Sequence, residues 1–188
     1  MVKLRNPWGN FEWEGDWGDN SDCWTDELRK KLDVDPAAND GTFWMDFNDM
    51  KKYMQCIQIS KINNSYSFSY FKDTQEEGSY GLFKFIVQAS GEYTLCVSQK
   101  GERMFSRDSG YQYSNVRMIL MKSLSNETSD FNVRYVKGAK GIQERDTYME
   151  LIDLEKGEYF CFIEVEWEPT TALEDRFFTF NSYGETEV

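Results

Sequence analysis

The sequence predicts a mainly β protein in which an antiparallel β-sandwich follows a small α+β region. The clearest observation is the segment 159–167, where every second residue is apolar and positions 164 and 166 are glutamates. This alternation is expected of a strand with one buried face. Similar short segments recur every 8 to 12 residues or so, separated by turn signals such as Ser90-Gly91, and this spacing is typical of a sandwich. Before residue 62 or so, helical and strand patterns instead alternate.

The N-terminal region predicts strands and helices in turn. Val2 and Leu4 share one face of a short strand, which ends at Asn6 because a residue before proline favours extended geometry. Trp24, Leu28 and Leu32 recur at helical spacing, and Asp46 is placed to cap a second helix. The elements expected here are strands at 2–5, 41–45 and 56–62 and helices at 21–32 and 46–54.

The remaining chain predicts the strands of the sandwich. A polar turn cluster at 63–65 and an acidic, glycine-containing stretch at 73–79 suggest a connection between two parts. We therefore expect a first domain at 1–62, a linker at 63–79 and a sandwich at 80–188. Strands are expected at 83–87, 93–97, 116–121, 132–136, 148–152, 159–167 and 177–180.

Composition excludes several classes of function. The net charge of -12 disfavours nucleic acid as a partner, because the summed field repels phosphate. No apolar run reaches the roughly 20 residues of a transmembrane helix, and no signal peptide opens the chain. The four cysteines are scattered, which favours free thiols. We expect an intracellular protein, cytoplasmic or associated with the cytoskeleton, and not a secreted one.

The first 45 residues carry a specific motif pattern. An Arg-Asn-Pro-Trp-Gly segment at 5–9 is followed by Glu12-Trp13, Gly15, Trp17 and Asp19, and then by Asp-Gly-Thr-Phe-Trp-Met at 40–45. This pattern resembles the end of the calpain protease core, a papain-like cysteine peptidase with a Cys-His-Asn triad. The resemblance implies that residues 1–62 are the C-terminal part of that core. It also implies a C2-like β-sandwich after the core, and the segments 91–95, 157–159 and 178–180 are similar to its strands.

The same resemblance implies a catalytic role for Asn6. Asn6 would orient the catalytic histidine and Trp8 would shield their hydrogen bond from water. The alternative is that Asn6 only caps a strand end through local hydrogen bonds. In the family the nucleophilic cysteine and the histidine precede this segment, whereas this chain contains no histidine. A thiol needs an adjacent base for this chemistry, so the chain alone is predicted to be inactive.

The resemblance further implies a calcium site. Its ligands would be Glu12, Asp19 and Asp40, with a backbone carbonyl near Ala38 and a further ligand at Thr42. Many family members carry glutamate at that last position, and threonine should weaken the site because it removes a charge. The alternative is that the three acids are ordinary surface residues.

Two weaker features lie in the sandwich. Lys100, Arg103 and Arg107 could form a small basic patch on a loop, relevant to lipid or protein contact. The basic, glycine-rich segment 137–141 lacks the Gly-Lys-Ser/Thr of a phosphate-binding loop, and we interpret it as a turn.

Three functions remain open from the sequence. The first is a non-catalytic structural or binding subunit of a larger assembly, in which a protein partner covers the truncated core; the initial methionine slightly favours it. The second is a fragment of a longer, active calpain-like cysteine peptidase. The third is a calcium- or lipid-responsive C2-like module.

Overall fold

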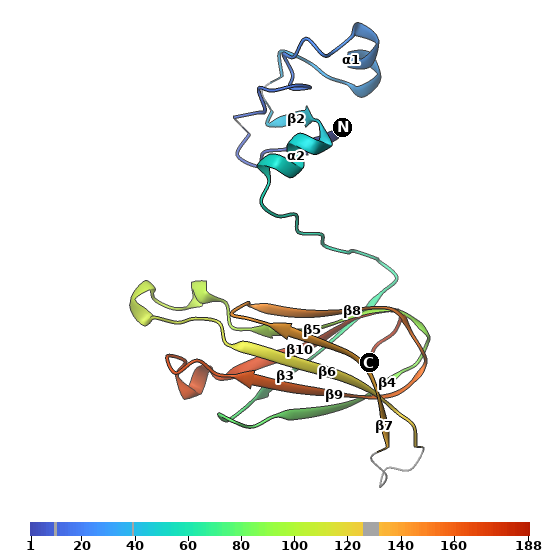
Figure 1. Ribbon diagram of the computed structural model, residues 1–188, viewed down its shortest axis with the longest axis vertical. Helices are drawn as coiled ribbons and strands as arrows, with labels where there is room; N and C mark the ends of the chain where they lie inside the picture. The colour runs from blue at the N-terminus through green and yellow to red at the C-terminus, as the bar shows by residue number, and fades with distance from the viewer. Residues whose placement is uncertain (10, 39, 126–131) are drawn as a thin grey trace. The chain divides into compact units, whose positions relative to one another are not determined.

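The computed structural model divides into two compact units, Met1–Lys61 and Ile62–Val188. It describes residues 1–9, 11–38, 40–125 and 132–188 (Figure 1). Unit 1 holds the Asn-Pro-Trp-Gly segment, and unit 2 holds the sandwich.

Unit 1 is built around a short two-stranded antiparallel sheet. Strand β1 pairs with β2 so that Val2 lies opposite Met45 and Arg5 opposite Thr42. The first helix begins after Thr25, whose hydroxyl accepts a hydrogen bond from Leu28 N. It is therefore shorter than the helix predicted at 21–32. The elements are β1 Val2–Arg5, α1 Asp26–Leu32, β2 Thr42–Met45 and α2 Phe47–Tyr53.

The core of unit 1 is small. Phe43, Met45 and Met50 form its buried cluster, with Val2, Leu4 and Trp13 packed against it. The strand predicted at 56–62 is absent, and all of these residues are exposed. The alternation of Ile57 and Ile59 was misleading because no neighbouring strand pairs with this segment in the described part of unit 1.

Unit 2 is an antiparallel sandwich of two four-stranded sheets, ordered β3-β10-β5-β8 and β4-β9-β6-β7. Consecutive strands lie in opposite sheets except for the β6–β7 pair. This alternation is the arrangement of an eight-stranded jelly roll. The predicted fold class, mainly β with an antiparallel sandwich, is confirmed. The strands are β3 Ser67–Thr74, β4 Gly81–Val87, β5 Gly91–Gln99, β6 Asn115–Ser123, β7 Val133–Gly141, β8 Asp146–Leu154, β9 Gly157–Glu166 and β10 Phe177–Gly184.

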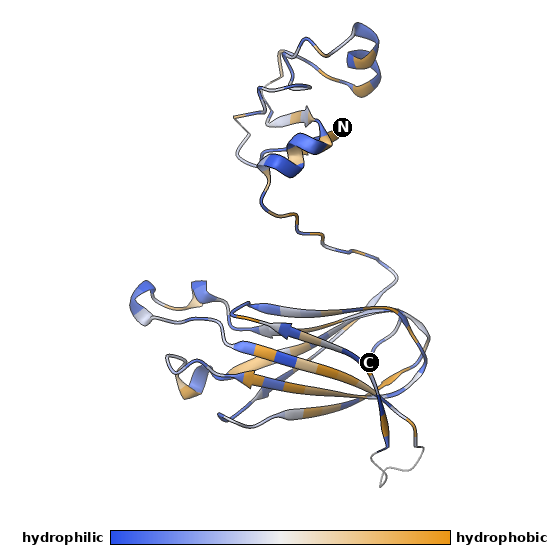
Figure 2. Ribbon diagram, in the orientation of Figure 1, coloured by the Kyte–Doolittle hydropathy of each residue, from blue (hydrophilic) through white to orange (hydrophobic). Residues whose placement is uncertain are grey.

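The inward faces of both sheets form one hydrophobic core. Figure 2 shows hydrophobic and hydrophilic residues alternating along strands of the sandwich. Tyr93 and Tyr159 are both buried. The Tyr93 hydroxyl donates to Ala89 O, and the Tyr159 hydroxyl donates to Glu155 O. A buried tyrosine requires such a partner for its hydroxyl.

Two predictions for this region are wrong. Residues 67–74, assigned to the linker, form β3, which pairs along its whole length with β10. The segment 137–141 is not a turn but the end of β7. Its Gly138 lies opposite Ile119 of β6, so glycine here occupies an ordinary ladder position.

Candidate functional site

The antiparallel β1–β2 pair brings the Asn-Pro-Trp-Gly segment at 6–9 and the Asp-Gly segment at 40–41 together. Just beyond the last strand pair, Asn6 N donates to Gly41 O at 2.7 Å. Gly9 N then donates to Asn6 O at 3.0 Å and closes the turn that contains Pro7 and Trp8. The Asn-Pro-Trp-Gly turn therefore lies against the Asp-Gly turn.

The side chain of Asn6 holds the loop that follows it. Its Oδ1 accepts a hydrogen bond from Trp8 N at 3.1 Å, and its Nδ2 donates to Phe11 O at 3.2 Å. These are the local bonds that the capping interpretation expects. They also fix the orientation of the amide, which a residue that positions a histidine requires.

Two aromatic side chains beside Asn6 lie in solvent. Trp8 is 84% exposed and Phe11 is 89% exposed. The backbone of Phe11 has a φ of 61°, which is uncommon for a bulky residue. Most of the surface of both rings is therefore accessible beside Asn6.

The three acids implied as calcium ligands converge on the same loops. Glu12 Oε1 accepts from Gly41 N at 2.7 Å, and Asp40 Oδ1 accepts from Thr42 N at 2.7 Å. Asp19 is buried, and its pKa is raised above the ordinary value. Burial is the largest cause, followed by the charge of Glu12, a side-chain hydrogen bond with Glu12 and the charge of Asp40. The structure thus places the Glu12 and Asp40 carboxylates within electrostatic reach of Asp19.

This arrangement does not by itself form a metal site. Among the described residues, no group of three or more His, Cys, Asp or Glu side chains is positioned to hold a metal ion. Glu12 and Asp40 each use an oxygen to accept a backbone N–H, and Thr42 hydrogen-bonds to Asp40. Calcium favours six to eight oxygen ligands, so binding would require these carboxylates to leave their backbone partners.

A tryptophan scaffold supports the acidic loop. Trp24 Nε1 donates to Gly18 O at 2.8 Å, and the Trp17 and Trp24 rings meet edge to face at 5.0 Å between centroids. Arg29 of α1 donates to Asp19 O at 2.8 Å. Sequence reasoning missed this role of Arg29. Its position in the last turn of a short helix gave no signal, because the contact depends on how the loop folds back.

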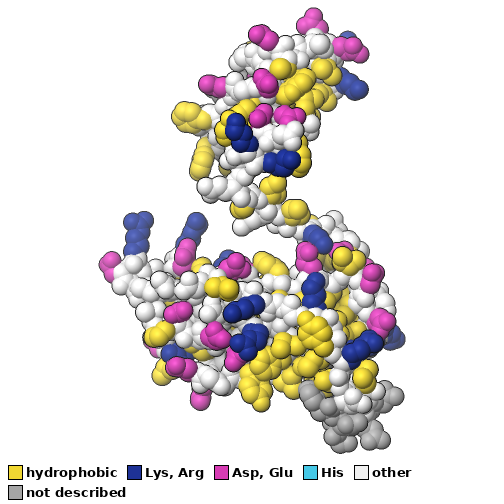
Figure 3. Space-filling view, in the orientation of Figure 1, with side chains coloured by type: hydrophobic (Ala, Val, Ile, Leu, Met, Phe, Trp, Pro, Cys, Tyr) yellow, Lys and Arg dark blue, Asp and Glu magenta, His cyan; other side chains and the backbone are white. Residues whose placement is uncertain are grey.

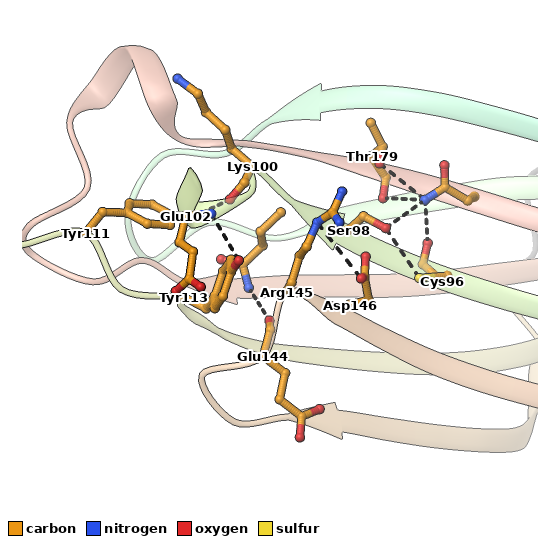
Figure 4. Close-up of polar contacts among 12 residues, drawn as sticks. Cys96, Ser98, Lys100, Glu102, Tyr111, Tyr113, Glu144, Arg145, Asp146 and Thr179 are labelled. Atoms are coloured by element: carbon orange, nitrogen blue, oxygen red, sulfur yellow. Dashed lines mark hydrogen bonds and ion pairs between the residues drawn. The ribbon is translucent and has the colours of Figure 1, made fainter. Parts of the chain in front are cut away.

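The basic patch predicted on the sandwich lies in a loop with contacts of its own (Figure 4). Lys100 pairs with Asp175 at 2.6 Å and lies over the Phe105 ring. The Tyr111 hydroxyl donates to Lys100 O, and the Tyr113 hydroxyl accepts from Glu102 N. Lys100 therefore contributes to the internal structure of this loop, whereas Arg103 and Arg107 lie in its short 3₁₀ turns.

Known proteins resemble unit 1. The model of the calpain family cysteine protease matches residues 1–61. Calpain-8 of Rattus norvegicus is 41% identical over 64 residues, which are 34% of this chain and 9% of that protein. Calpain-5 of Mus musculus is 41% identical over 87 residues, covering 44% of this chain and 13% of that protein. The calpain-type cysteine protease DEK1 of Arabidopsis thaliana is 38% identical over 63 residues, covering 33% of this chain and 3% of that protein.

Unit 1 is thus the part of the chain that resembles a family of cysteine proteases. Residues 1–61 are similar to the calpain family. The chain spans 13% or less of the length of the three relatives named above. Among solved structures, the pre-peptidase C-terminal domain of collagenase from Bacillus anthracis has a TM-score of 0.36 and 11% identity, covering 61% of this chain and 85% of that chain. In the described part of the chain, no helix is long and apolar enough to cross a membrane.

Replacing Asp19 with asparagine should stabilise unit 1 at neutral pH by up to about 1 kcal/mol. The raised pKa means that the folded state holds the Asp19 proton more tightly than the unfolded state does. The contribution of the carboxyl group is therefore favourable in acid and is lost as the pH rises through its folded pKa. Urea unfolding followed by tryptophan fluorescence reports mainly unit 1, which contains five of the six tryptophans.

The matched control for this prediction is the exposed Asp16→Asn. It should change the free energy of unfolding little at any pH. The advantage of Asp19→Asn over the wild type should vanish well below the ordinary aspartate pKa of about 3.9, where the carboxyl group is protonated in both the folded and the unfolded state. A destabilised Asp19→Asn protein at pH 7 without added metal would contradict the electrostatic interpretation.

Proposed function

We propose that this calpain-like chain acts without catalysis of its own, as a structural or binding subunit of a larger intracellular assembly. The observation that carries the proposal is the exposed aromatic pair Trp8 and Phe11 beside Asn6. Unit 1 has a small core. Because a domain of this size buries little apolar surface, leaving two large aromatic side chains in solvent costs it stability. A protein partner would cover them.

The chemistry of the cysteines supports the absence of catalysis. Burial raises the pKa of Cys96 to about 11 and that of Cys161 to about 12, so neither is a thiolate at neutral pH. Cys23 and Cys56 are more accessible, but the chain contains no histidine to activate them. None of the four cysteines forms a disulfide, which favours a reducing, intracellular location.

The test is the native mass and the activity of the protein isolated from its source. We expect a stable complex well above the 22.2 kDa of the chain, with no turnover of a fluorogenic peptide with or without calcium. Oxidative footprinting should show Trp8 protected in that complex and reactive in the purified 188-residue chain. Equal reactivity of Trp8 in the two samples would overturn the proposal.

A second candidate is that Asn6 completes a cysteine–histidine pair supplied by another segment or chain. The fixed amide of Asn6, held by Trp8 N and Phe11 O, favours it. If the native assembly hydrolyses peptides, Asn6→Ala should lower kcat by orders of magnitude, because a triad asparagine sets the histidine tautomer. The exposed Asn20→Ala should leave the rate unchanged. Loss of binding without an effect on kcat would assign Asn6 a structural role only.

Calcium or lipid response is a third candidate. Asp19, which the charges of Glu12 and Asp40 disfavour as a carboxylate, would gain from a cation once Glu12 and Asp40 release their backbone partners. Millimolar calcium should then raise the unfolding midpoint of unit 1 in the wild type and raise it less in Asp19→Asn. An equal shift in both proteins would place calcium elsewhere. The loop that carries the exposed Arg103 and Arg107 is the candidate for lipid contact.

A further inference from the structure

The edge strand β3 is exposed and uncharged along most of its length. β3 ends the β3-β10-β5-β8 sheet, and among the described residues it pairs only with β10, in a register without interruption. Phe68 is 59% exposed, Tyr70 is 71% exposed and Phe71 is 57% exposed. An edge strand offers a row of backbone N–H and C=O groups to another strand. We call the free side of residues 67–74 the β3 edge.

The other three sheet edges each carry a charge at the middle residue of the strand. These residues are Lys84 of β4, Lys137 of β7 and Glu150 of β8. Charged side chains, lysine above all, keep the edges of natural sheets from pairing with other chains. The first charge on β3 is Lys72, and its middle residues are aromatic. Figure 3 shows hydrophobic side chains gathered on the part of the sandwich where Figure 1 labels β3, β4 and β9. Of the four edges that the structure describes, the β3 edge is therefore the one without a charge at its middle.

Alternate backbone groups of β3 point away from β10. Gln99 N donates to Arg145 O, on the side of β8. Successive residues of a strand direct their N–H and C=O groups to opposite sides, so the groups of Ser98 face β10. The register carries this alternation across β10 to β3, where the groups of Phe71 face β10. The N–H groups that point to the free side are therefore those of Phe68, Tyr70 and Lys72.

The charges of β3 and its flanks favour a second copy of the chain in antiparallel orientation. Residues 63–71 carry no charge, whereas Lys72 and Asp73 are followed by Glu76 and Glu77 in the next turn. A parallel copy would set lysine beside lysine and acid beside acid. An antiparallel copy sets the charged end of each strand along the uncharged start of the other, so no like charges meet. The repulsion between two chains of net charge -12 is screened beyond about 8 Å at physiological ionic strength.

We propose that two copies of this chain pair through their β3 edges, antiparallel about a two-fold axis at Phe71. In this register the two exposed Phe71 rings lie opposite each other, whereas a register centred on Tyr70 would set Phe71 against Ser69. Tyr70 lies opposite Lys72 of the second copy, a residue that also lies over the Phe177 ring of its own sheet, 3.7 Å from the centroid. Aromatic pairs and cation–π contacts both stabilise facing strands. The joined sheet ends on both sides at β8, whose middle residue is charged, so the assembly closes at two copies.

The first test measures the mass and the amide exchange of the purified chain. Sedimentation equilibrium should give twice the 22.2 kDa of the chain at the highest soluble concentration and a single copy on dilution. In the dimer, amide hydrogen exchange should slow at Phe68, Tyr70 and Lys72, while exchange at Phe71, whose N–H faces β10, stays the same. A chain that stays monomeric, or a dimer without this alternate protection, would overturn the proposal. The test needs no partner at Trp8, so this proposal and the function proposed for the chain can fail separately.

The second test uses charge variants of the full chain. Tyr70→Lys sets a lysine opposite Lys72 at two places in the dimer and should raise its dissociation constant roughly tenfold or more. Adding Lys72→Glu turns both repulsive pairs into attractive ones and should restore the affinity of the wild type. Tyr148→Lys on the outward side of β8 is the matched control and should have no effect, with circular dichroism confirming that each variant is folded. A double variant that does not recover would refute the register, and an equal loss in Tyr148→Lys would refute the β3 edge as the contact.

Discussion

Gly41→Ala should destabilise unit 1 by about 2 to 5 kcal/mol, which is enough to unfold a unit with so small a core. Gly41 has a φ of +81°, in the left-handed region that favours glycine. An added Cβ would lie 2.6 Å from Asn6 O and 2.9 Å from the Gly9 Cα, both of them backbone atoms. The substitution therefore adds a clash to the backbone strain. Tryptophan fluorescence in urea measures the loss, and the circular dichroism of the sandwich should persist.

The matched control for Gly41→Ala is Gly9→Ala. Gly9 has a similar φ of +71°, but nothing lies within 4 Å of a Cβ built on it. Gly9→Ala should lower the free energy of unfolding only by the strain of the left-handed backbone conformation, about 1 kcal/mol. The difference between the two variants measures the contact between the Asn-Pro-Trp-Gly turn and the Asp-Gly turn. Equal losses would mean that the two turns are not in contact in solution.

The strands with one apolar face could be predicted from the sequence, and β3 could not. β9 alternates strongly from Tyr159 onward, and its bounds are close to those expected. On β3, the residues that share the inward parity of Phe71 include Ser67 and Ser69, so no apolar alternation marks the strand. Its position depends on pairing with β10, more than 100 residues away in the chain. Long-range pairing leaves no local signal.

The candidate sites show a similar division. The proximity of Glu12, Asp19 and Asp40 was implied by family resemblance, and no periodicity would have brought together residues so far apart in the sequence. The outward residues of β9, in contrast, are apolar in a way that the sequence itself shows. The run Tyr-Phe-Cys-Phe-Ile at 159–163 is apolar at every position, so both faces of the strand are apolar there. Glu164 and Glu166 restore the polar alternation only beyond this run.

Gln75→Met should destabilise the sandwich by about 2 to 5 kcal/mol. Gln75 is buried. Its side-chain amide bonds to the β9 backbone just beyond the residue paired with Gly81, where β4 begins. Its Nε2 donates to Ile163 O at 3.0 Å, and its Oε1 accepts from Val165 N at 3.2 Å. Methionine nearly preserves the shape of the side chain but leaves both buried backbone groups without this partner. Each such group costs about 1 to 3 kcal/mol.

Two measurements separate this hydrogen-bonding role from simple packing. Urea unfolding followed by far-ultraviolet circular dichroism gives the loss of stability, and the exposed Gln88→Ala at the other end of β4 should change it little. Amide hydrogen exchange should accelerate at Val165, whose N–H loses its acceptor, more than at Ile163, which pairs with Gly81. A loss of stability with unchanged exchange at Val165 would show that Gln75 only fills space. A rise in exchange at Val165 would show that the Gln75 side chain continues the hydrogen bonding of β9 beyond Gly81, where the pairing of β4 begins.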